Sequence, residues 1–370
     1  MSQFLMKPTL HQLDSVKEFV DAFAIGEGDL LFTNRHFYDD YFKALDLKCD
    51  VIHPKDYGQG EPTDELVEAI AKDITKDYKR IISVGGGSAL DVAKFFVFDQ
   101  PCPILDLFDG TRSPKKVREL VLVPTTCGTG SEVTSVAALA LVSRGSKAGY
   151  GNPGMFPDHA VLIPELLQSL PMEPFATSAI DALIHAVESA LSPKATPISK
   201  LLSYEAIDLI LKGFKKIVAE GPEARKPILE DFLFASTYAG VAFSNAGCAA
   251  VHALSYPLGG TFHVPHGESN YAMFTGVMRN YMEIKQDGEI AVLNQRIASI
   301  LECDAADVYD KIEDLLNHLV QKKPLHEYGM SEAQIVEFAD SVFEKQQRLL
   351  VNNFVPFDRD RIEKIYRELY

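Results

Sequence analysis

Hydrophobic positions in the first half of the chain follow two alternating patterns. Short runs rich in β-branched residues predict strands at 29–34, 80–84 and 119–126, and amphipathic helical patterns lie between them. The second run is followed at once by glycines and then by a helical stretch. Because strands that alternate with helices form parallel sheets, this half predicts an α/β domain.

The second half has a different pattern. From about residue 174 onward the strand signals stop and long helical patterns take over. Turn-forming residues interrupt these patterns at 192–197, 220–227 and 257–267. We therefore expect an α/β domain over residues 1–175 and an all-helical domain over residues 176–370.

Composition narrows the class of ligand. With 370 residues and a hydrophobic fraction of 46%, the chain is long enough to bury two cores. The formal charge of -16 and the absence of basic runs argue against nucleic acid and anionic membranes as partners, since both require clustered Lys or Arg. A small molecule is the expected ligand.

The chain carries no signal for a membrane or an oxidising compartment. No apolar stretch approaches the ~20 residues of a membrane helix, and the start "MSQFLMKPTLHQLDS" does not resemble a signal peptide. The five cysteines are scattered and form no CxxC pair, which favours packing or free thiols. We expect a cytoplasmic protein whose cysteines have no chemical role.

The first candidate site is the glycine-rich segment "VGGGSALDVAK" at 84–94. A strand that runs into Gly85, Gly86 and Gly87 lets backbone amides approach an anion, and Ser88 can cap the helix that follows. This geometry is typical of phosphate binding, although a tight strand-to-helix turn is the alternative. Asp91 either completes a capping box with Ser88 or contacts the ligand.

A second polar segment, "PTTCGTGSEVT" at 124–134, follows the next predicted strand. If it lies beside the glycine loop at the carboxyl ends of the strands, it lines the crevice where open α/β sheets bind nucleotides. A polar hairpin or a surface loop is the alternative.

Histidine and aspartate in the helical half indicate a metal site. Asp181 and His185, in "DALIHAVES", lie four residues apart on one face of a helix predicted to begin near Ser178. An ordinary helix with a buried histidine is the alternative for this pair alone. A helix that carries His252 and a glycine-turn segment that carries His266 can complete a four-ligand set.

The segment "HALSYPLGGTFHVPHGESN" at 252–270 also contains His263, three residues before His266. We expect His263 to be either a proton-relay group or an exposed side chain. Three neutral imidazoles and one carboxylate leave a divalent ion with net positive charge, which is suited to polarising a substrate oxygen.

Taken in order, "GGGSALDVAK", "PTTCGTGSEVT", "DALIHAVES" and "HALSYPLGGTFHVPHGESN" resemble the iron-containing alcohol dehydrogenase family over nearly the whole chain. The resemblance implies a dehydroquinate synthase-like fold, with an N-terminal dinucleotide-binding α/β domain and a C-terminal helical metal-binding domain. It also implies hydride transfer between an alcohol and NAD, with Fe²⁺ or Zn²⁺ as the metal.

The resemblance assigns roles to individual residues. The implied metal ligands are Asp181, His185, His252 and His266. The implied cofactor contacts are Gly86, Gly87, Ser88, Thr125, Thr126, Lys147 and Leu162.

Two positions depart from the family pattern. Tyr256 stands where many members have a second histidine, so the candidates for proton transfer are Tyr256 and His263. Asn34 follows the first strand, where members that prefer NAD often have an acidic residue. We therefore expect NAD as cofactor, with weaker discrimination against NADP.

The compact length and the stretches "DYGQGEPTDE" and "QQRLLVNNFVPF" are similar to the members that interconvert 4-hydroxybutyrate and succinate semialdehyde. The expected partners are such a hydroxy acid or aldehyde and a second copy of the chain in a homodimer. Arg348 and Arg279 are candidates for holding the substrate carboxylate, although each can also be an ordinary surface arginine.

Three other functions stay open at this point. They are a general short-chain alcohol or diol dehydrogenase, a lyase of the dehydroquinate synthase type, and a catalytically silent nucleotide-binding protein. The lyase should need several cationic side chains for a phosphorylated substrate, and the complete ligand set argues against the silent protein.

Overall fold

The computed structural model describes residues 3–58 and 60–370, which form two compact units. One unit comprises residues 6–170, and the other comprises Pro171–Tyr370 with the described residues before Met6. Leu5 joins the second unit through two hydrogen bonds: its backbone N–H donates to Asn245 Oδ1 (2.6 Å), and Asn245 Nδ2 donates to its carbonyl (2.9 Å). None of the helices in the described part of the chain is both long and apolar enough to cross a membrane.

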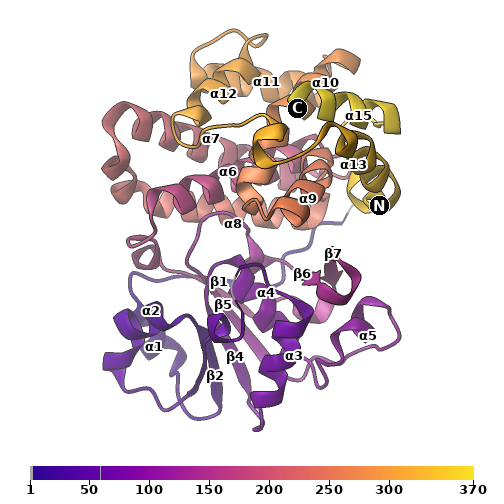
Figure 1. Ribbon diagram of the computed structural model, residues 1–370. Helices are drawn as coiled ribbons and strands as arrows, with labels where there is room; N and C mark the ends of the chain where they lie inside the picture. Colours follow the sequence, from indigo (N-terminus) through magenta and orange to yellow (C-terminus); the bar gives the residue numbers. More distant parts are fainter. Residues whose placement is uncertain (1–2, 59) are drawn as a thin grey trace. The chain divides into compact units, whose positions relative to one another are not determined.

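A parallel sheet organises residues 6–170 (Figure 1). Within the described residues its strand order is β1-β8-β5-β4-β2-β3, and every neighbouring pair is parallel. An antiparallel pair, β6 and β7, forms a second sheet. The strands are β1 (Thr9–Gln12), β2 (Asp29–Thr33), β3 (Asp50–Ile52), β4 (Arg80–Gly85), β5 (Glu119–Pro124), β6 (Val136–Leu141), β7 (Ser146–Gly151) and β8 (His159–Leu162).

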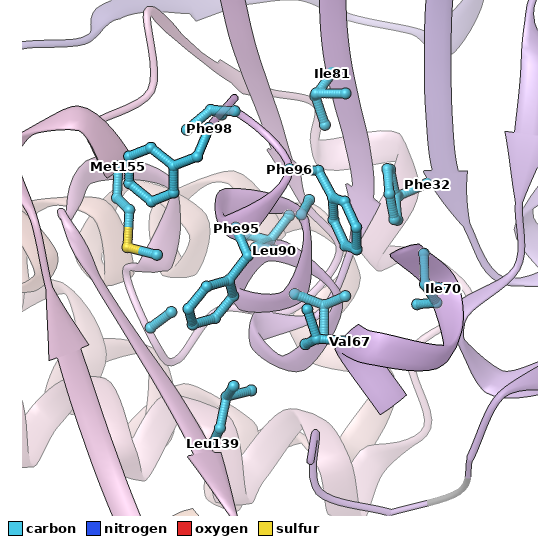
Figure 2. Packing of buried hydrophobic residues seen from close by; sticks show 14 of the residues in the cluster. Phe32, Val67, Ile70, Ile81, Leu90, Phe95, Phe96, Phe98, Leu139 and Met155 are labelled. Atoms are coloured by element: carbon cyan, nitrogen blue, oxygen red, sulfur yellow. The ribbon is translucent and has the colours of Figure 1, made fainter. Parts of the chain in front are cut away.

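Both faces of the parallel sheet are buried. Phe32 lies in one core with Val67 of α3 and Leu90 of α4 (Figure 2), and Leu122 of β5 belongs to the same core. Val121, on the opposite face of β5, is also fully buried. Burial on both faces is typical of parallel sheets. The helices of this unit are α1 (Val16–Phe23), α2 (Arg35–Phe37), α3 (Asp64–Asp73), α4 (Gly87–Phe95) and α5 (Ile104–Phe108).

The second unit is helical, as predicted, and α6 lies at its centre. This helix packs against α7, α8 and α10, and every residue from Ala179 to Leu191 is buried. A helix that is apolar on all sides needs neighbours all around it. The helices are α6 (Met172–Leu191), α7 (Pro197–Glu220), α8 (Leu229–Ala246), α9 (Ala250–Phe262), α10 (His266–Ile284), α11 (Glu289–Leu301), α12 (Val308–Asn317), α13 (Glu332–Lys345), α14 (Gln347–Leu350) and α15 (Arg359–Leu369).

Two predicted helix limits are wrong, and each lies close to a proline. The helix expected near Ser178 begins at Met172, because Pro174 lies in its first turn, where no backbone hydrogen bond is lost. The interruption expected from Pro257 onward begins only after Phe262. Pro257 lies inside α9, which continues for five residues beyond it.

Candidate metal centre and nucleotide-binding loops

The glycine-rich segment lies at the carboxyl end of β4. Gly86 is the N-cap of α4 and Gly87 is its first residue, so the free N–H groups of the first turn are available to an anion. In the sheet, β3 lies on one side of β2, and the next strand along the chain, β4, lies on the other side of β2. The strand order therefore reverses between β2 and β4, which is the position where open α/β sheets bind ligands.

The predicted helix cap is wrong. Gly86 caps α4 without a side-chain hydrogen bond, and Ser88 is exposed within the first turn, because the helix begins one residue before it. The Asp91 carboxylate accepts hydrogen bonds from the Ser131 hydroxyl (2.6 Å) and from the Ala138 backbone N–H (2.9 Å). Asp91 thus joins α4 to the threonine-rich segment and forms no capping box.

The two polar segments lie against each other, as expected. A Cβ atom built on Gly87 would be 2.6 Å from Cγ2 of Thr129, and one built on Gly86 would be 3.4 Å from Cγ2 of Thr126. The first distance is far below an ordinary carbon contact. Glycine at position 87 therefore permits the close approach of the two loops.

Lys94, to which the sequence analysis assigned no role, connects the glycine-rich helix α4 to the threonine-rich segment. Its fully buried Nζ donates to Ser131 Oγ (2.7 Å), to Thr134 Oγ1 (3.1 Å) and to the Val136 carbonyl (2.7 Å). Asp91 Oδ1 lies 3.2 Å from the ammonium. Burial lowers the pKa of Lys94, and the Asp91 charge opposes that change. The network fixes the glycine-rich and threonine-rich segments as one rigid piece.

The other cofactor candidates lie at different places. Asn34, Thr125 and Leu162 follow or end the strands β2, β5 and β8, so they share the carboxyl edge of the sheet. The side-chain oxygen of Asn34 is buried and has no hydrogen-bond partner among the described residues. Lys147 lies in β7 of the smaller sheet, where its ammonium is 2.5 Å from Glu61.

Three histidines of the second unit cluster around the carboxylate of Asp181. Asp181 and His185 come from α6, His252 comes from α9, and His266 is the first residue of α10. The sequence-based placement of His266 in a glycine turn is wrong, because Pro265 acts as the N-cap and the helix begins at once.

The spacing of these groups fits a divalent cation. Asp181 Oδ1 lies 3.8 Å from Nε2 of both His252 and His266, and its Oδ2 lies 3.9 Å from His185 Nδ1. These distances are too long for hydrogen bonds. His252 Nε2 is buried and has no hydrogen-bond partner among the described residues. A buried, unpartnered imidazole nitrogen that faces a carboxylate and two further imidazoles is suited to binding a metal.

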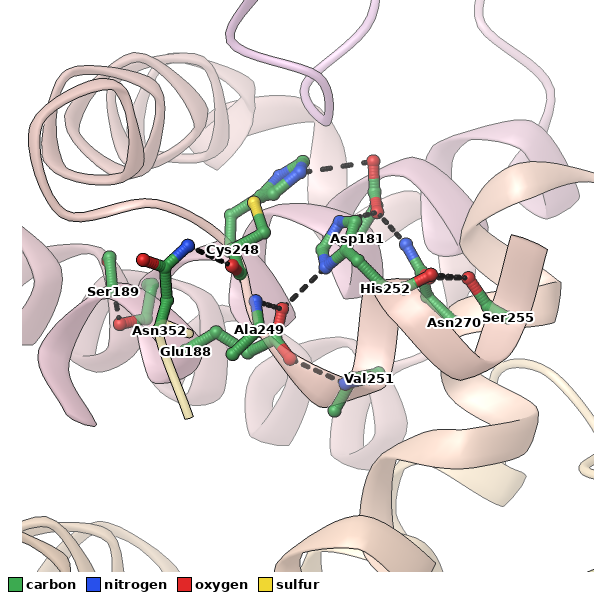
Figure 3. Close-up of polar contacts among 12 residues, drawn as sticks. Asp181, Glu188, Ser189, Cys248, Ala249, Val251, His252, Ser255, Asn270 and Asn352 are labelled. Atoms are coloured by element: carbon green, nitrogen blue, oxygen red, sulfur yellow. Dashed lines mark hydrogen bonds and ion pairs between the residues drawn. The ribbon is translucent and has the colours of Figure 1, made fainter. Parts of the chain in front are cut away.

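Two residues absent from the sequence analysis orient the ligands (Figure 3). Glu188 accepts hydrogen bonds from two backbone N–H groups at the start of α9 and lies 2.6 Å from His252 Nδ1, which leaves Nε2 to face Asp181. Asn270 Nδ2 donates to Asp181 Oδ1 (2.7 Å). Such partners fix the orientation of ligand side chains and tune their affinity.

Burial and neighbouring charges shift the pKa values of Asp181 and His252 in opposite directions. Burial alone would raise the pKa of Asp181, but the three histidines and Asn270 hold it below its usual value. Burial would lower the pKa of His252, but Glu188 raises it above its usual value.

Helical periodicity contains a signal for both missed residues. Asp181, His185 and Glu188 stand at positions i, i+4 and i+7 of α6, and Asn270 stands four residues after His266 in α10. Residues at these spacings share one helix face. Polar residues on the ligand face could therefore have been identified from the sequence.

Gly267 allows α10 to approach α6 at the site. A Cβ atom at this position would lie 2.1 Å from the carbonyl oxygen of Thr177 and 2.8 Å from its carbonyl carbon. Both are backbone atoms, which cannot rotate away. Glycine after His266 therefore brings this imidazole close to Asp181.

Cys248 also faces the cluster. Its thiol and one nitrogen each of His185 and His252 lie within 4.8 Å of one another. Burial raises the pKa of Cys248 well above its usual value, and the charges of Glu188 and Asp181 add to this effect. The thiol is thus held in its neutral form beside the ligands.

The candidates for proton transfer and for carboxylate binding differ in their surroundings. The Tyr256 ring lies 6.3 Å from the His266 ring, and its hydroxyl is 3.4 Å from a guanidinium nitrogen of Arg348. His263 is exposed and ends α9 with a φ of 56°. Arg279 forms ion pairs with carboxylates of α12.

Two family models together match most of the chain. The model for iron-containing alcohol dehydrogenase matches residues 10–164, and the C-terminal model of the Fe-containing alcohol dehydrogenase family matches residues 175–370. The second match alone spans more than half of the chain.

Individual relatives agree with this result. The chain is 46% identical to 4-hydroxybutyrate dehydrogenase of Clostridium kluyveri, over 100% of both chains. It is 36% identical to long-chain-alcohol dehydrogenase 1 of Geobacillus thermodenitrificans, over 83% of this chain and 78% of that protein. The crystal structure of sulfoacetaldehyde reductase from Bifidobacterium kashiwanohense in complex with NAD+ has a TM-score of 0.83 and 26% identity, over 100% of this chain and 98% of the other. The chain therefore belongs to the iron-containing alcohol dehydrogenase family.

Proposed function

We propose that this protein interconverts 4-hydroxybutyrate and succinate semialdehyde by metal-assisted hydride transfer to and from NAD(H). The observation that carries the proposal is the 46% identity to the Clostridium kluyveri enzyme over the full length of both chains. The ligand cluster in one unit and the glycine-rich loop in the other supply the two binding functions that this reaction needs.

Asp181, His185, His252 and His266 are the proposed ligands of a divalent cation, with Fe²⁺ favoured and Zn²⁺ also suited to this donor set. When bound, the cation polarises the substrate oxygen as a Lewis acid. Glu188 keeps Nδ1 of His252 occupied, which directs Nε2 toward the other ligand atoms.

The proposed nucleotide site lies at the carboxyl edge of the sheet. The N–H groups of the first turn of α4, at Gly87 and Ser88, are suited to the pyrophosphate, while Thr125 and Thr126 line the neighbouring segment. The unpartnered Asn34 oxygen is suited to accepting a hydrogen bond from a ribose hydroxyl. NAD, when bound, accepts the hydride.

The Tyr256 hydroxyl and the exposed His263 imidazole are the proposed route for the substrate hydroxyl proton. The proposal also includes a homodimer in the cytoplasm, which light scattering and cell fractionation can test.

A cofactor-linked absorbance assay tests the proposed reaction. Protein loaded with one defined metal is supplied with NAD and with 4-hydroxybutyrate, 1-butanol or 1,4-butanediol. We expect 4-hydroxybutyrate to have the highest kcat/KM. Equal values for the alcohol, the diol and the acid would instead identify a general alcohol dehydrogenase.

A further inference from the structure

The segment that contains α14 is anchored beside the metal cluster. Asn352 Nδ2 donates to the Cys248 carbonyl (2.8 Å), and a Cβ atom at Gly247 would lie 2.3 Å from Asn352 Nδ2. The chain just before α9 and the chain just after α14 are therefore in close contact. This contact holds Arg348, one turn before Asn352, next to the start of α9.

Arg348 faces the same side of α9 as His252. Tyr256, whose hydroxyl lies 3.4 Å from the Arg348 guanidinium, stands four residues after His252, so both residues lie on one helix face. Burial raises the pKa of Tyr256, and the Arg348 charge opposes this rise. The same charge also acts on His252 and Cys248. A positive charge thus stands at one side of the metal cluster.

The Arg348 guanidinium has no carboxylate partner within the described residues, because the arginines that pair with carboxylates there do not include Arg348. Arg279 is different, because Asp310 (2.7 Å) and Glu313 (3.2 Å) neutralise its charge. Of the two arginines suggested by the sequence, only Arg348 therefore combines a free positive charge with a position near the ligands.

We propose that Arg348, whose guanidinium lies beside Tyr256, binds the carboxylate of a short ω-hydroxy acid whose hydroxyl end lies at the metal cluster. The proposal rests on the proposed function and names the residue that selects its substrate. One turn of α9 separates His252 from Tyr256, a rise of about 6 Å. A chain of three methylene groups has a comparable length, so the site selects an acid of this size over a neutral alcohol.

The test compares an acid with a neutral substrate of the same length. Steady-state kinetics of the NAD- and metal-loaded enzyme are measured with 4-hydroxybutyrate and with 1,4-butanediol for wild type, Arg348→Gln and Arg348→Lys. Arg279→Gln is the matched control, because it removes the paired arginine. Isothermal titration calorimetry with butyrate, which has no hydroxyl and cannot react, measures carboxylate binding separately from turnover.

We expect Arg348→Gln to lower kcat/KM for 4-hydroxybutyrate by about 10- to 150-fold, mainly through KM, which is the range for a hydrogen bond to a charged group. The value for 1,4-butanediol should stay essentially unchanged. Arg348→Lys should lose less of this value than Arg348→Gln, and the control Arg279→Gln should behave as wild type. Butyrate binding should weaken in parallel in Arg348→Gln.

The outcomes separate this inference from the proposed function. If wild type prefers 4-hydroxybutyrate and Arg348→Gln keeps that preference, the carboxylate site is wrong and the proposed reaction stands. If wild type does not oxidise 4-hydroxybutyrate but binds butyrate through Arg348, the proposed substrate is wrong and the carboxylate site stands. Loss of activity on acid and diol alike in Arg348→Gln would overturn the inference, because a specificity residue should not affect the diol.

Discussion

Replacing Gly267 with alanine should damage metal binding without touching a ligand. The new Cβ atom would lie 2.1 Å from the Thr177 carbonyl oxygen. Non-bonded carbon atoms are normally at least about 3.5 Å from their neighbours. The first turn of α10 must therefore move away from α6 by on the order of 1 Å. His266 is the residue directly before Gly267 and moves with it.

The size of the effect follows from this displacement. Ligand distances tolerate only about 0.2 Å, so a shift on the order of 1 Å takes His266 out of ligand geometry relative to Asp181. Loss of a residue that hydrogen-bonds a metal ligand typically weakens metal affinity by about 10- to 100-fold, and we expect Gly267→Ala to weaken it at least as much. The overpacked contact should also lower the free energy of unfolding of the apoprotein by about 1–3 kcal/mol.

Competition with a chromophoric chelator measures the affinity, and thermal unfolding of the apoprotein measures stability. Gly260→Ala is the matched control: this glycine lies in α9, and a Cβ atom there would have no described atom within 4 Å apart from its chain neighbours and the backbone of its own helix. Because alanine favours a helix over glycine, the control should be stable or slightly stabilised and should bind metal normally. Wild-type metal affinity and stability in Gly267→Ala would show that the close approach of α10 to α6 does not position His266.

Three further substitutions test the proposed metal ligands and the proposed nucleotide contacts. His266→Ala should lose the metal and activity but keep NAD binding, measured by metal analysis and nucleotide titration; normal metal content with near-normal turnover would refute the four-ligand assignment. Glu188→Gln should weaken metal affinity by about 10- to 100-fold in the chelator assay, because it removes the charge beside His252 Nδ1, and unchanged affinity would contradict this role. Asn34→Asp should increase the ratio of kcat/KM for NAD over NADP, because a carboxylate repels the 2′-phosphate; no change in the ratio would place the ribose elsewhere.

The parts of the fold that sequence predicted are those with continuous apolar segments. The strands β2, β4 and β5 are buried along most of their length, so their hydrophobic runs were visible. The strand β1 (Thr9–Gln12) has mostly exposed side chains and β3 (Asp50–Ile52) is very short. Their place in the sheet comes from hydrogen bonds to neighbours distant in sequence, which no local pattern contains.

The site shows a similar division. Residue type and spacing identified Asp181, His185, His252 and His266 as a possible ligand set, and the structure brings these side chains together. The distinction between Arg348 and Arg279 depends on ion pairs with residues far away in sequence. Only the three-dimensional arrangement reveals which positive charge is free.

The hydrogen bonds between Leu5 and Asn245 have a consequence for synthesis on the ribosome. Residues 6–170 contain every described strand of the parallel sheet, so this unit can fold when about half of the chain has emerged. Leu5 can form its hydrogen bonds only after Asn245, 240 residues later, has been synthesised. The proposed ligand set is complete only after His266 has been synthesised. Metal binding by the proposed ligands is therefore expected late in synthesis, and the folding of residues 6–170, which contain none of these ligands, should not depend on the metal supply.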